Sequence, residues 1–233
     1  HYRTGILHFP QSRGKCEKGK IMGTNIRLLI INPNSDKETT KKIETKAEIL
    51  SLPGVETTVK TLSYMPKLIT SLEDVQKAEE GMLQLIRNDV LYDAYLIGCH
   101  LDPNLMLLRE ITTKPVIGIG EASIRMASMQ CSSFAVISPS VRSGQRKRRM
   151  IRDNYCTDQY CGAVAVKEES REAVLEAAGE AVERWHPEGI VLGCANYTLW
   201  DKDIEQCYPV KCYDGVACGM FLATGLFCYE QIK

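Results

Sequence analysis

The chain alternates short apolar runs with longer segments of helical periodicity. Residues 71–88 and 170–185 place apolar side chains three and four positions apart, and Ser71 precedes the first of these segments as an N-cap candidate. Such alternation is typical of an α/β fold with a largely parallel sheet. The apolar runs predict strands at 26–31, 55–61, 94–97, 116–119, 133–137, 162–166, 190–192 and 210–212.

The second half of the chain repeats features of the first. Residues 94–103 read AYLIGCHLDP and residues 189–198 read GIVLGCANYT, so an apolar strand runs into Gly-Cys and a polar turn in both halves. A Pro-Val pair follows each cysteine, at 115–116 and again at 209–210. Self-similarity over half a chain indicates two lobes of similar construction. We therefore predict two pseudo-symmetric lobes, each a largely parallel sheet flanked by helices, with the active site between them.

The repeat also suggests where the lobes begin and end. We expect residues 22–119 together with 213–233 to form the first α/β lobe, and residues 120–212 to form the second. Residues 1–21 carry no apolar periodicity and have no counterpart in the repeat. We interpret them as a disordered leader or upstream extension.

Polar loops follow the predicted strands at equivalent places in both halves. Strand 26–31 leads into Asn-Pro-Asn-Ser at 32–35, and strand 133–137 leads into Ser-Pro-Ser at 138–140. Ligands of open α/β sheets bind outside the carboxyl ends of the strands. Asn32, Cys99, Ser138 and Cys194 should therefore converge on one cleft, with the two cysteines on opposite walls.

Composition narrows the class of partner. The chain has 233 residues, of which 29 are basic and 29 acidic, so no overall charge favours nucleic acid or an anionic membrane. No apolar run approaches the roughly 20 residues that a membrane helix requires, so no membrane span is expected. The basic run Arg146–Arg149 is interpreted as a solvated helix face. We expect a small-molecule substrate and neither nucleic acid nor a membrane as partner.

The cysteines favour a reduced protein over a disulfide framework. There are ten of them, but no apolar stretch near the beginning of the chain resembles a secretory signal. No C-x-x-C pair is present, so a structural zinc site is not expected. We expect a cytoplasmic protein without a metal.

Two cysteines on facing walls are suited to inverting a stereocentre next to a carbonyl. That reaction needs a base on one face of the carbon and an acid on the other. A thiol can take both roles, because its reference pKa of about 8.5 lies near neutral pH. Cys99 and Cys194 are thus the candidate catalytic pair.

The sequence resembles a known family, the hydantoin racemase group of the aspartate/glutamate racemase superfamily, which includes allantoin racemase-like fungal proteins. The similar segments are INPNS at 31–35, GCHLDPNL at 98–105, PVIGIGEAS at 115–123, VLGCANYT at 191–198, and PV with DGVACG within 209–219. The resemblance implies a two-lobed α/β fold, no cofactor, Cys99 and Cys194 as the proton-transfer pair, and Asn32 as a substrate-binding residue.

The resulting hypothesis is a cofactor-independent racemase or epimerase that moves a proton at a carbon next to a carbonyl. The substrate would be a small hydantoin-like, ureide or amino-acid-derived compound, and a homo-oligomer is expected. Around the two cysteines we predict substrate contacts from the following residues: Asn32, Ser35, His100, Glu121, Ser138, Ser140, Ala195, Asn196 and Tyr197.

Three departures from the family pattern bear on the substrate. Asn104 stands where glycine is frequent, Asn196-Tyr197 replaces a small Gly-Met pair, and Ser138-Pro139-Ser140 replaces two threonines. Two alternatives stay open. One is a cysteine-dependent isomerase or decarboxylase of the same superfamily, which needs only one proton-donating or nucleophilic cysteine. The other is a non-catalytic ligand-binding relative.

Deleting residues 1–21 should leave the melting temperature and the activity nearly unchanged, because the segment shows neither periodicity nor a repeat counterpart. Thermal unfolding of the truncated and full-length chains tests this. A large drop in either quantity would mean that the segment packs on the core or seals an interface.

Overall fold

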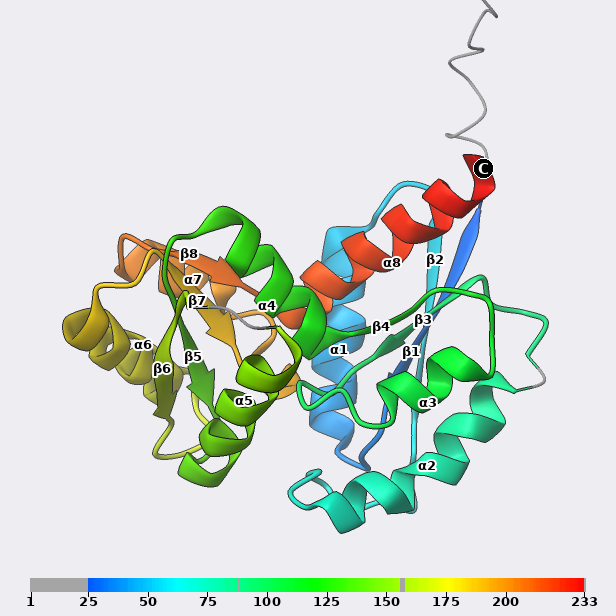
Figure 1. Cartoon of the computed structure of the whole chain (residues 1–233), viewed down its shortest axis with the longest axis horizontal. Helices are drawn as coiled ribbons and strands as arrows, with labels where there is room; N and C mark the ends of the chain where they lie inside the picture. The colour runs from blue at the N-terminus through cyan, green and yellow to red at the C-terminus, as the bar shows by residue number, and fades with distance from the viewer. Residues whose placement is uncertain (1–24, 88, 156–157, 233) are drawn as a thin grey trace, which may run out of the picture.

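The computed structural model describes residues 25–232, except 88, 156 and 157, and folds them into two α/β lobes (Figure 1). The expected leader, residues 1–21, lies outside the described residues. Each lobe contains one four-stranded sheet, and every strand pair is parallel. The predicted fold class is thus confirmed.

The first sheet has the strand order β2-β1-β3-β4. Its central strands, β1 (Ile26–Asn32) and β3 (Ala94–Ile97), are paired from Leu28 with Ala94 to Ile31 with Ile97. β2 (Val55–Thr61) and β4 (Val116–Gly118) lie at the edges. β3 is buried along its whole length, because helices cover both faces of the sheet.

The second sheet repeats this order as β6-β5-β7-β8. β5 (Phe134–Ser138) and β7 (Gly189–Leu192) are central, whereas β6 (Tyr160–Ala165) and β8 (Lys211–Tyr213) lie at the edges. Each strand of the first sheet therefore has one counterpart in the second. All eight strands lie where the apolar runs predict them, to within two residues at either end.

Several helices begin after an N-cap residue whose side chain accepts a backbone hydrogen bond. Ser71 accepts a hydrogen bond from the backbone N–H of Asp74 at 3.0 Å, and Asp74 accepts one from that of Ser71 at 2.7 Å, which is a capping box. Ser170 accepts from the N–H of Ala173 in the same way. The helices are α1 (Lys37–Leu50), α2 (Leu72–Ile86), α3 (Leu105–Glu110), α4 (Ile119–Gln130), α5 (Val141–Asn154), α6 (Arg171–Trp185), α7 (Asp201–Cys207) and α8 (Gly215–Ile232).

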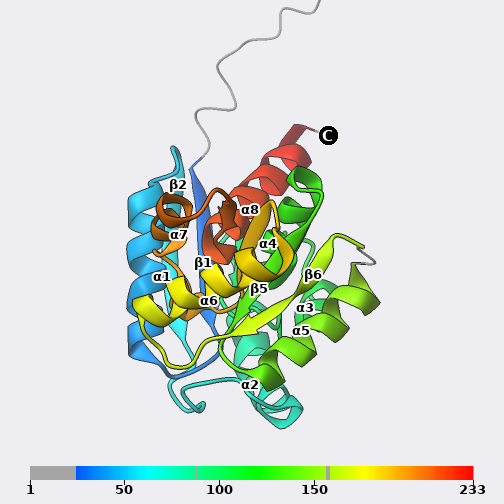
Figure 2. The same ribbon diagram turned by 90° about the vertical axis from the view of Figure 1, so that its left-hand side faces the viewer.

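Three apolar clusters hold these layers together. Along β1, Leu29 and Ile31 point to the cluster beneath α2 and α3, whereas Leu28 and Ile30 point to the opposite one. That second cluster also contains Phe134 of the second sheet, so one continuous core joins the lobes. α1, α4 and α8 lie along this junction, as the two perpendicular views show (Figure 1 and Figure 2).

The last helix is more apolar than the sequence analysis expected. Glu230 is the one charged residue among the 18 of α8, which by length and composition alone could cross a membrane. However, α8 contacts α1, α4, β1, β3 and β4. A Cβ at Gly219 would meet a methyl group of Leu96 at 2.3 Å, so the helix lies directly on the sheet. We interpret α8 as a core helix that closes the first lobe.

A buried lysine of the first lobe contacts two carboxylates at the junction between the lobes. Lys46 on α1 is 6% exposed, and its ammonium lies 2.8 Å from Asp201 and 3.2 Å from Asp214. Asp201 begins α7, and Asp214 accepts the N–H groups of Val216 and Ala217 at the start of α8. Burial by itself lowers the pKa of Lys46, but the two carboxylates outweigh it and raise that pKa, so the ammonium stays charged.

Replacing Lys46 by methionine should lower the free energy of unfolding by about 3–5 kcal/mol, because Asp201 and Asp214 are then buried without their cation. Urea denaturation measures the loss. Lys41→Met on the same helix is the matched control, since its side chain is 69% exposed and its contact with Glu44 is long, at 3.9 Å. Equal effects of the two substitutions would contradict a special role for the buried lysine.

Candidate active site

The strand order determines where a ligand can bind. In each sheet the chain passes from a central strand to the edge and then returns to the other central strand, so loops diverge above β1 and β3 and above β5 and β7. Such switch points leave a crevice at the carboxyl ends of the strands. A cavity of about 220 Å³ lies there, and loops after β1, β2, β3, β5, β6 and β7 contribute to its lining.

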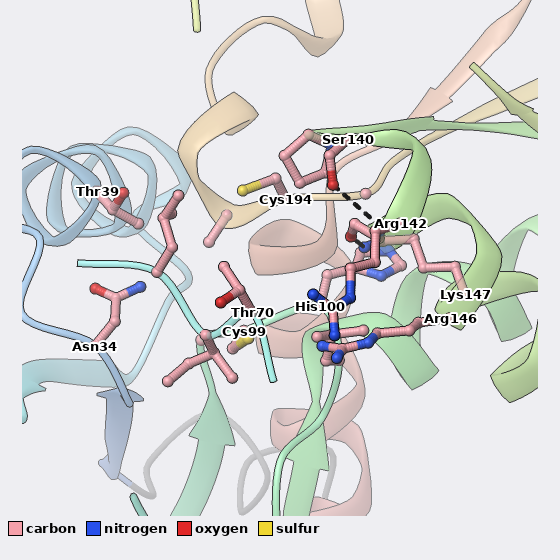
Figure 3. Close-up of a pocket in the computed structure, with 18 of the residues that line it drawn as sticks. Asn34, Thr39, Thr70, Cys99, His100, Ser140, Arg142, Arg146, Lys147 and Cys194 are labelled. Atoms are coloured by element: carbon pink, nitrogen blue, oxygen red, sulfur yellow. Dashed lines mark hydrogen bonds between the residues drawn. The ribbon is translucent and has the colours of Figure 1, made fainter. Parts of the chain in front are cut away.

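Both candidate cysteines line this cavity, one from each lobe (Figure 3). Cys99 follows β3 and Cys194 follows β7, the equivalent strands of the two sheets. His100, Ser140 and Ala195 are the other predicted site residues in the lining. The described lining also includes residues that were not predicted, among them Asn34, Thr39, Thr70, Arg142, Arg146 and Lys147.

The two thiols have equivalent backbone donors. The backbone N–H of Leu101 hydrogen-bonds to Cys99, and that of Asn196 hydrogen-bonds to Cys194, so each sulfur receives a donor from two residues further along the chain. These donors favour the thiolate. Burial dominates, however, and raises the pKa of Cys99 to about 12 and that of Cys194 above its ordinary value. Each free thiol therefore holds its proton at neutral pH.

The glycine before each cysteine lets the flanking helix approach closely. A Cβ at Gly98 would lie 3.2 Å from the backbone oxygen of Ile31 and 3.2 Å from the terminal methyl group of Ile43 on α1. A Cβ at Gly193 would lie 2.4 Å from the oxygen of Ile137 and 2.9 Å from Cε of Lys147 on α5. Ile43 and Lys147 thus occupy equivalent places beneath the two cysteines.

Lys147 is the most unusual residue of the cavity. Its side chain is 1% exposed, and Nζ donates a hydrogen bond to the hydroxyl of Ser143 at 2.7 Å. It forms no ion pair with any described residue. The expectation that the run 146–149 is a solvated face is therefore wrong for Lys147, which lies on the buried stripe of α5 with Gly144 and Ile151. Arg148 and Arg149 are exposed, as expected.

His100 lies on the cavity wall as a buried, neutral imidazole. Burial is the main cause that holds its pKa well below 6.5, and the positive charge of Lys147 adds to it. Nε2 lies 3.2 Å from the hydroxyl of Ser123, whereas Nδ1 has no hydrogen-bond partner among the described residues. A buried polar atom without a partner is available to a ligand.

Three predicted substrate contacts of the first strand-end loop and of α4 are engaged elsewhere in the protein. The amide group of Asn32 donates to Thr40 Oγ1 at 2.9 Å, and the backbone N–H of Ser35 donates to the oxygen of Pro66 at 3.1 Å, which orders the loop that carries Asn34. Glu121 is paired with Arg109 at 2.5 Å and with Arg125 at 3.1 Å, outside the cavity. Their contact with a substrate stays a prediction.

Ser138, Asn196 and Tyr197 are also absent from the lining. The hydroxyl of Ser138 donates to the backbone oxygen of Ser140 at 3.2 Å, which shapes the β5–α5 turn. Asn196 accepts from Lys42 through both its side-chain and backbone oxygens, at 2.9 Å and 3.1 Å. Tyr197 is completely buried and stacks on Trp200. Asn196 and Tyr197 thus pack behind the Cys194 loop, whereas Ser138 bonds within its own turn.

The structure explains the departure at Asn104 without reference to the substrate. Asn104 has a left-handed backbone, with φ 58°, where α3 begins. Glycine and asparagine are the residues that adopt this conformation most readily. The side chain donates to the backbone oxygen of Val75 on α2 at 2.9 Å, and Asn104 is not in the described lining of the cavity.

Sequence reasoning missed the basic wall of the cavity because it treated the run 146–149 as one unit. Arg142, Arg146 and Lys147 line the cavity from α5, and Glu169 is the one carboxylate in the described lining. The helical spacing of Gly144, Lys147 and Ile151 was the signal that could have placed Lys147 on the inner face.

In the part of the chain that the structure describes, no three His, Cys, Asp or Glu residues cluster closely enough to hold a metal ion.

Known proteins share both this sequence pattern and this fold. The family model described as Asp/Glu/Hydantoin racemase matches residues 28–223. A hydantoin racemase of Paenarthrobacter aurescens is 28% identical over 214 residues, which cover 86% of this chain and 91% of the relative. A hydantoin racemase of Pseudomonas sp. (strain NS671) is 29% identical over 218 residues, covering 85% and 84%.

Among solved structures, the allantoin racemase from Klebsiella pneumoniae superposes with a TM-score of 0.82 at 25% identity, covering 88% of this chain and 89% of its own. The family match spans more than half of the chain, and the relatives are similar over nearly their whole length. The two-lobed protein is a racemase, an isomerase that belongs to the Asp/Glu/hydantoin racemase family.

Proposed function

We propose that Cys99 and Cys194 act as opposed acid and base in a cofactor-independent racemisation. The observation that carries the proposal is that both thiols line one cavity from equivalent places in the two lobes. The substrate would be a small hydantoin-like, ureide or amino-acid-derived compound with a stereocentre next to a carbonyl. The cavity volume of about 220 Å³ suits such a size.

In the forward direction, one cysteine as thiolate takes the proton from the stereocentre. The electron pair of the broken C–H bond moves into the adjacent carbonyl and forms an enolate. The other cysteine then gives its thiol proton to the opposite face, so the enolate electron pair forms the new C–H bond and that cysteine becomes the thiolate. Protons and electrons balance within the pair, and the two cysteines exchange roles for the reverse direction.

The surroundings of the thiols support such an exchange. Leu101 and Asn196 supply equivalent backbone donors, so neither cysteine is fixed as the permanent base by its loop. The high pKa values make the thiolate a strong base once it forms, because a base with a higher conjugate-acid pKa accepts the carbon-bound proton more readily. Positive charge on α5 lies in the same cavity and stabilises both the thiolate and the enolate.

The presence of two cysteines favours racemisation over the alternatives. An isomerase or decarboxylase of this superfamily needs one such group, and a binding protein needs neither. Exchange of the substrate's stereocentre proton in deuterium oxide separates these reactions, because a binding protein shows no exchange and a decarboxylase releases carbon dioxide.

We further propose that the enzyme works as a homo-oligomer in the cytoplasm. Phe221, Tyr229 and Ile232 of α8 are at least half exposed, which supports an interface between copies. The described cysteines are free thiols, as a reducing compartment would keep them.

Cys99→Ser and Cys194→Ser should each lower racemisation by about 10²- to 10⁴-fold or more, since a hydroxyl is a far weaker acid than a thiol. Each variant should still exchange the proton of the one enantiomer that faces the surviving thiolate, and the two variants should prefer opposite enantiomers. Proton NMR of each pure enantiomer of a turned-over hydantoin in deuterium oxide measures this.

Cys207→Ser is the matched control, because Cys207 is exposed at the end of α7 and lies outside the described lining of the cavity. Its exchange rates should equal those of the unaltered enzyme. If both active-site variants lost exchange of the same enantiomer only, or if Cys194→Ser remained fully active, a single-cysteine isomerase or decarboxylase would replace the two-base mechanism.

The reactivity of the two thiols should rise steeply with pH. Because burial raises both pKa values, the thiolate fraction in the free enzyme increases about tenfold per pH unit and does not saturate near the pKa of about 8.5 of a model thiol. Iodoacetamide alkylation of Cys99 and Cys194, resolved by peptide mass spectrometry, should therefore still accelerate where a model cysteine peptide has reached its plateau. A plateau at or below neutral pH would contradict the proposed ionisation states.

A further inference from the structure

Three cationic side chains lie on one wall of the cavity. Arg142, Arg146 and Lys147 come from the first two turns of α5, and none of them forms an ion pair with a described residue. The one carboxylate in the described lining, Glu169, is on an exposed part of its loop. The cavity therefore carries an excess of positive charge, although the chain as a whole is neutral.

Of these three charges, the ammonium of Lys147 costs the most free energy to bury. An ammonium removed from water needs an anion or several acceptors, and the described protein gives this one only the hydroxyl of Ser143. Lys46 shows how the same chain stabilises a buried lysine that serves structure, with two carboxylates within 3.2 Å. Lys147 has no such partners.

The internal repeat shows that the fold does not require a cation here. The equivalent residue of the first lobe is Ile43, which packs beneath Gly98 as Lys147 packs beneath Gly193. Both side chains are almost completely buried. An apolar residue thus fills the place in one lobe, whereas the other lobe carries a charge beside Cys194.

A charge that served only the enolate would meet its partner for a brief part of the reaction. A partner that is present before the reaction begins accounts better for a buried ammonium, because the ion pair then forms when substrate binds. Burial lowers the pKa of Lys147, and negative charge on Cys194 or Cys99 raises it, so an anion in the cavity stabilises the charged form.

We propose that the substrate carries a carboxylate in addition to the carbonyl beside its stereocentre, and that Lys147, with Arg146 and Arg142, binds this carboxylate at the α5 wall. The inference rests on the proposed racemisation and specifies its substrate class as an anionic hydantoin or ureide rather than a neutral one. Lys147 is accordingly a residue that determines specificity, and it does so by binding the substrate's carboxylate.

A matched pair of probes tests the proposal. The compounds are 5-(carboxymethyl)hydantoin and 5-(carbamoylmethyl)hydantoin, which have nearly the same shape but differ by one negative charge. Exchange of the ring C5 proton in deuterium oxide is followed by NMR, with a sample without enzyme as the baseline. The enzyme should prefer the carboxylate by about 10- to 100-fold in kcat/KM, the range for a hydrogen bond to a charged group.

Lys147→Met keeps the length and the apolar stem of the side chain but removes the charge. This variant should lose most of the preference, because KM rises for the carboxylate and not for the amide. A loss of kcat that comes from the thiolates or the enolate should be equal for the two probes. Arg148→Met is the matched control, because Arg148 is the next residue on the same helix, is exposed, and lies outside the described lining. It should retain the preference.

Equal rates of the unaltered enzyme on both probes would overturn the proposal. So would an unchanged preference in Lys147→Met, with kcat/KM falling equally for both probes, because the lysine would then act on the thiols or the enolate alone. If Lys147→Met does not fold, the comparison of the two probes with the unaltered enzyme still decides, and Arg146→Gln should lower the preference part of the way.

Binding measured by calorimetry separates this inference from the proposed function. Binding of the carboxylate probe without exchange would support the anion site and count against racemisation of this compound. Exchange of neutral hydantoins with neither binding nor exchange of the carboxylate probe would overturn the anion site and leave the racemisation standing.

Discussion

The geometry of the active site depends on contacts that the first lobe makes with the loop after Cys194. Lys46 is paired with Asp201 across the junction and with Asp214 at the start of α8. Lys42, one turn earlier on α1, binds Asn196 and lies over the ring of Trp200 at 4.4 Å. The helix that follows β1 therefore fixes the position of the cysteine loop of the other lobe. The proposed proton transfer to either face of one carbon requires that the two walls keep a constant separation, and this ion-paired junction supplies the constraint.

The fold could be predicted from the sequence because its signals are local and repeated. The apolar runs mark all eight strands, Ser71 and Ser170 mark helix starts, and the two Gly-Cys turns reveal the duplication. The strand order was not predicted, but the convergence of the strand-end loops did not depend on it, since parallel sheets place these loops at one edge. Cys99 and Cys194 were consequently found in one cavity without any information from long-range contacts.

The remainder of the site could not be predicted, because it depends on which way a side chain points. Asn32 and Ser138 end the correct strands, but the side chain of Asn32 donates to Thr40 on α1 and that of Ser138 to the backbone oxygen of Ser140. Tyr197 is adjacent to the Cys194 turn and yet packs behind it, against Trp200. Lys147 was assigned to solvent because its neighbours are basic, although its spacing from Gly144 and Ile151 places it inside. In each of these residues, tertiary packing decided between two environments that the local sequence left equivalent.

The place that Ile43 and Lys147 share in the repeat has a consequence for how such an enzyme can change. A cavity formed across a true two-fold axis between identical chains would carry every substitution twice, so a lysine on one wall would bring a second lysine to the other. Here both halves belong to one polypeptide, and each wall is encoded separately. One wall can therefore acquire recognition of a particular chemical group while the other keeps the apolar packing that the fold needs. Duplication within the chain thus preserves the two-fold placement of the two cysteines and frees the rest of the cavity from symmetry.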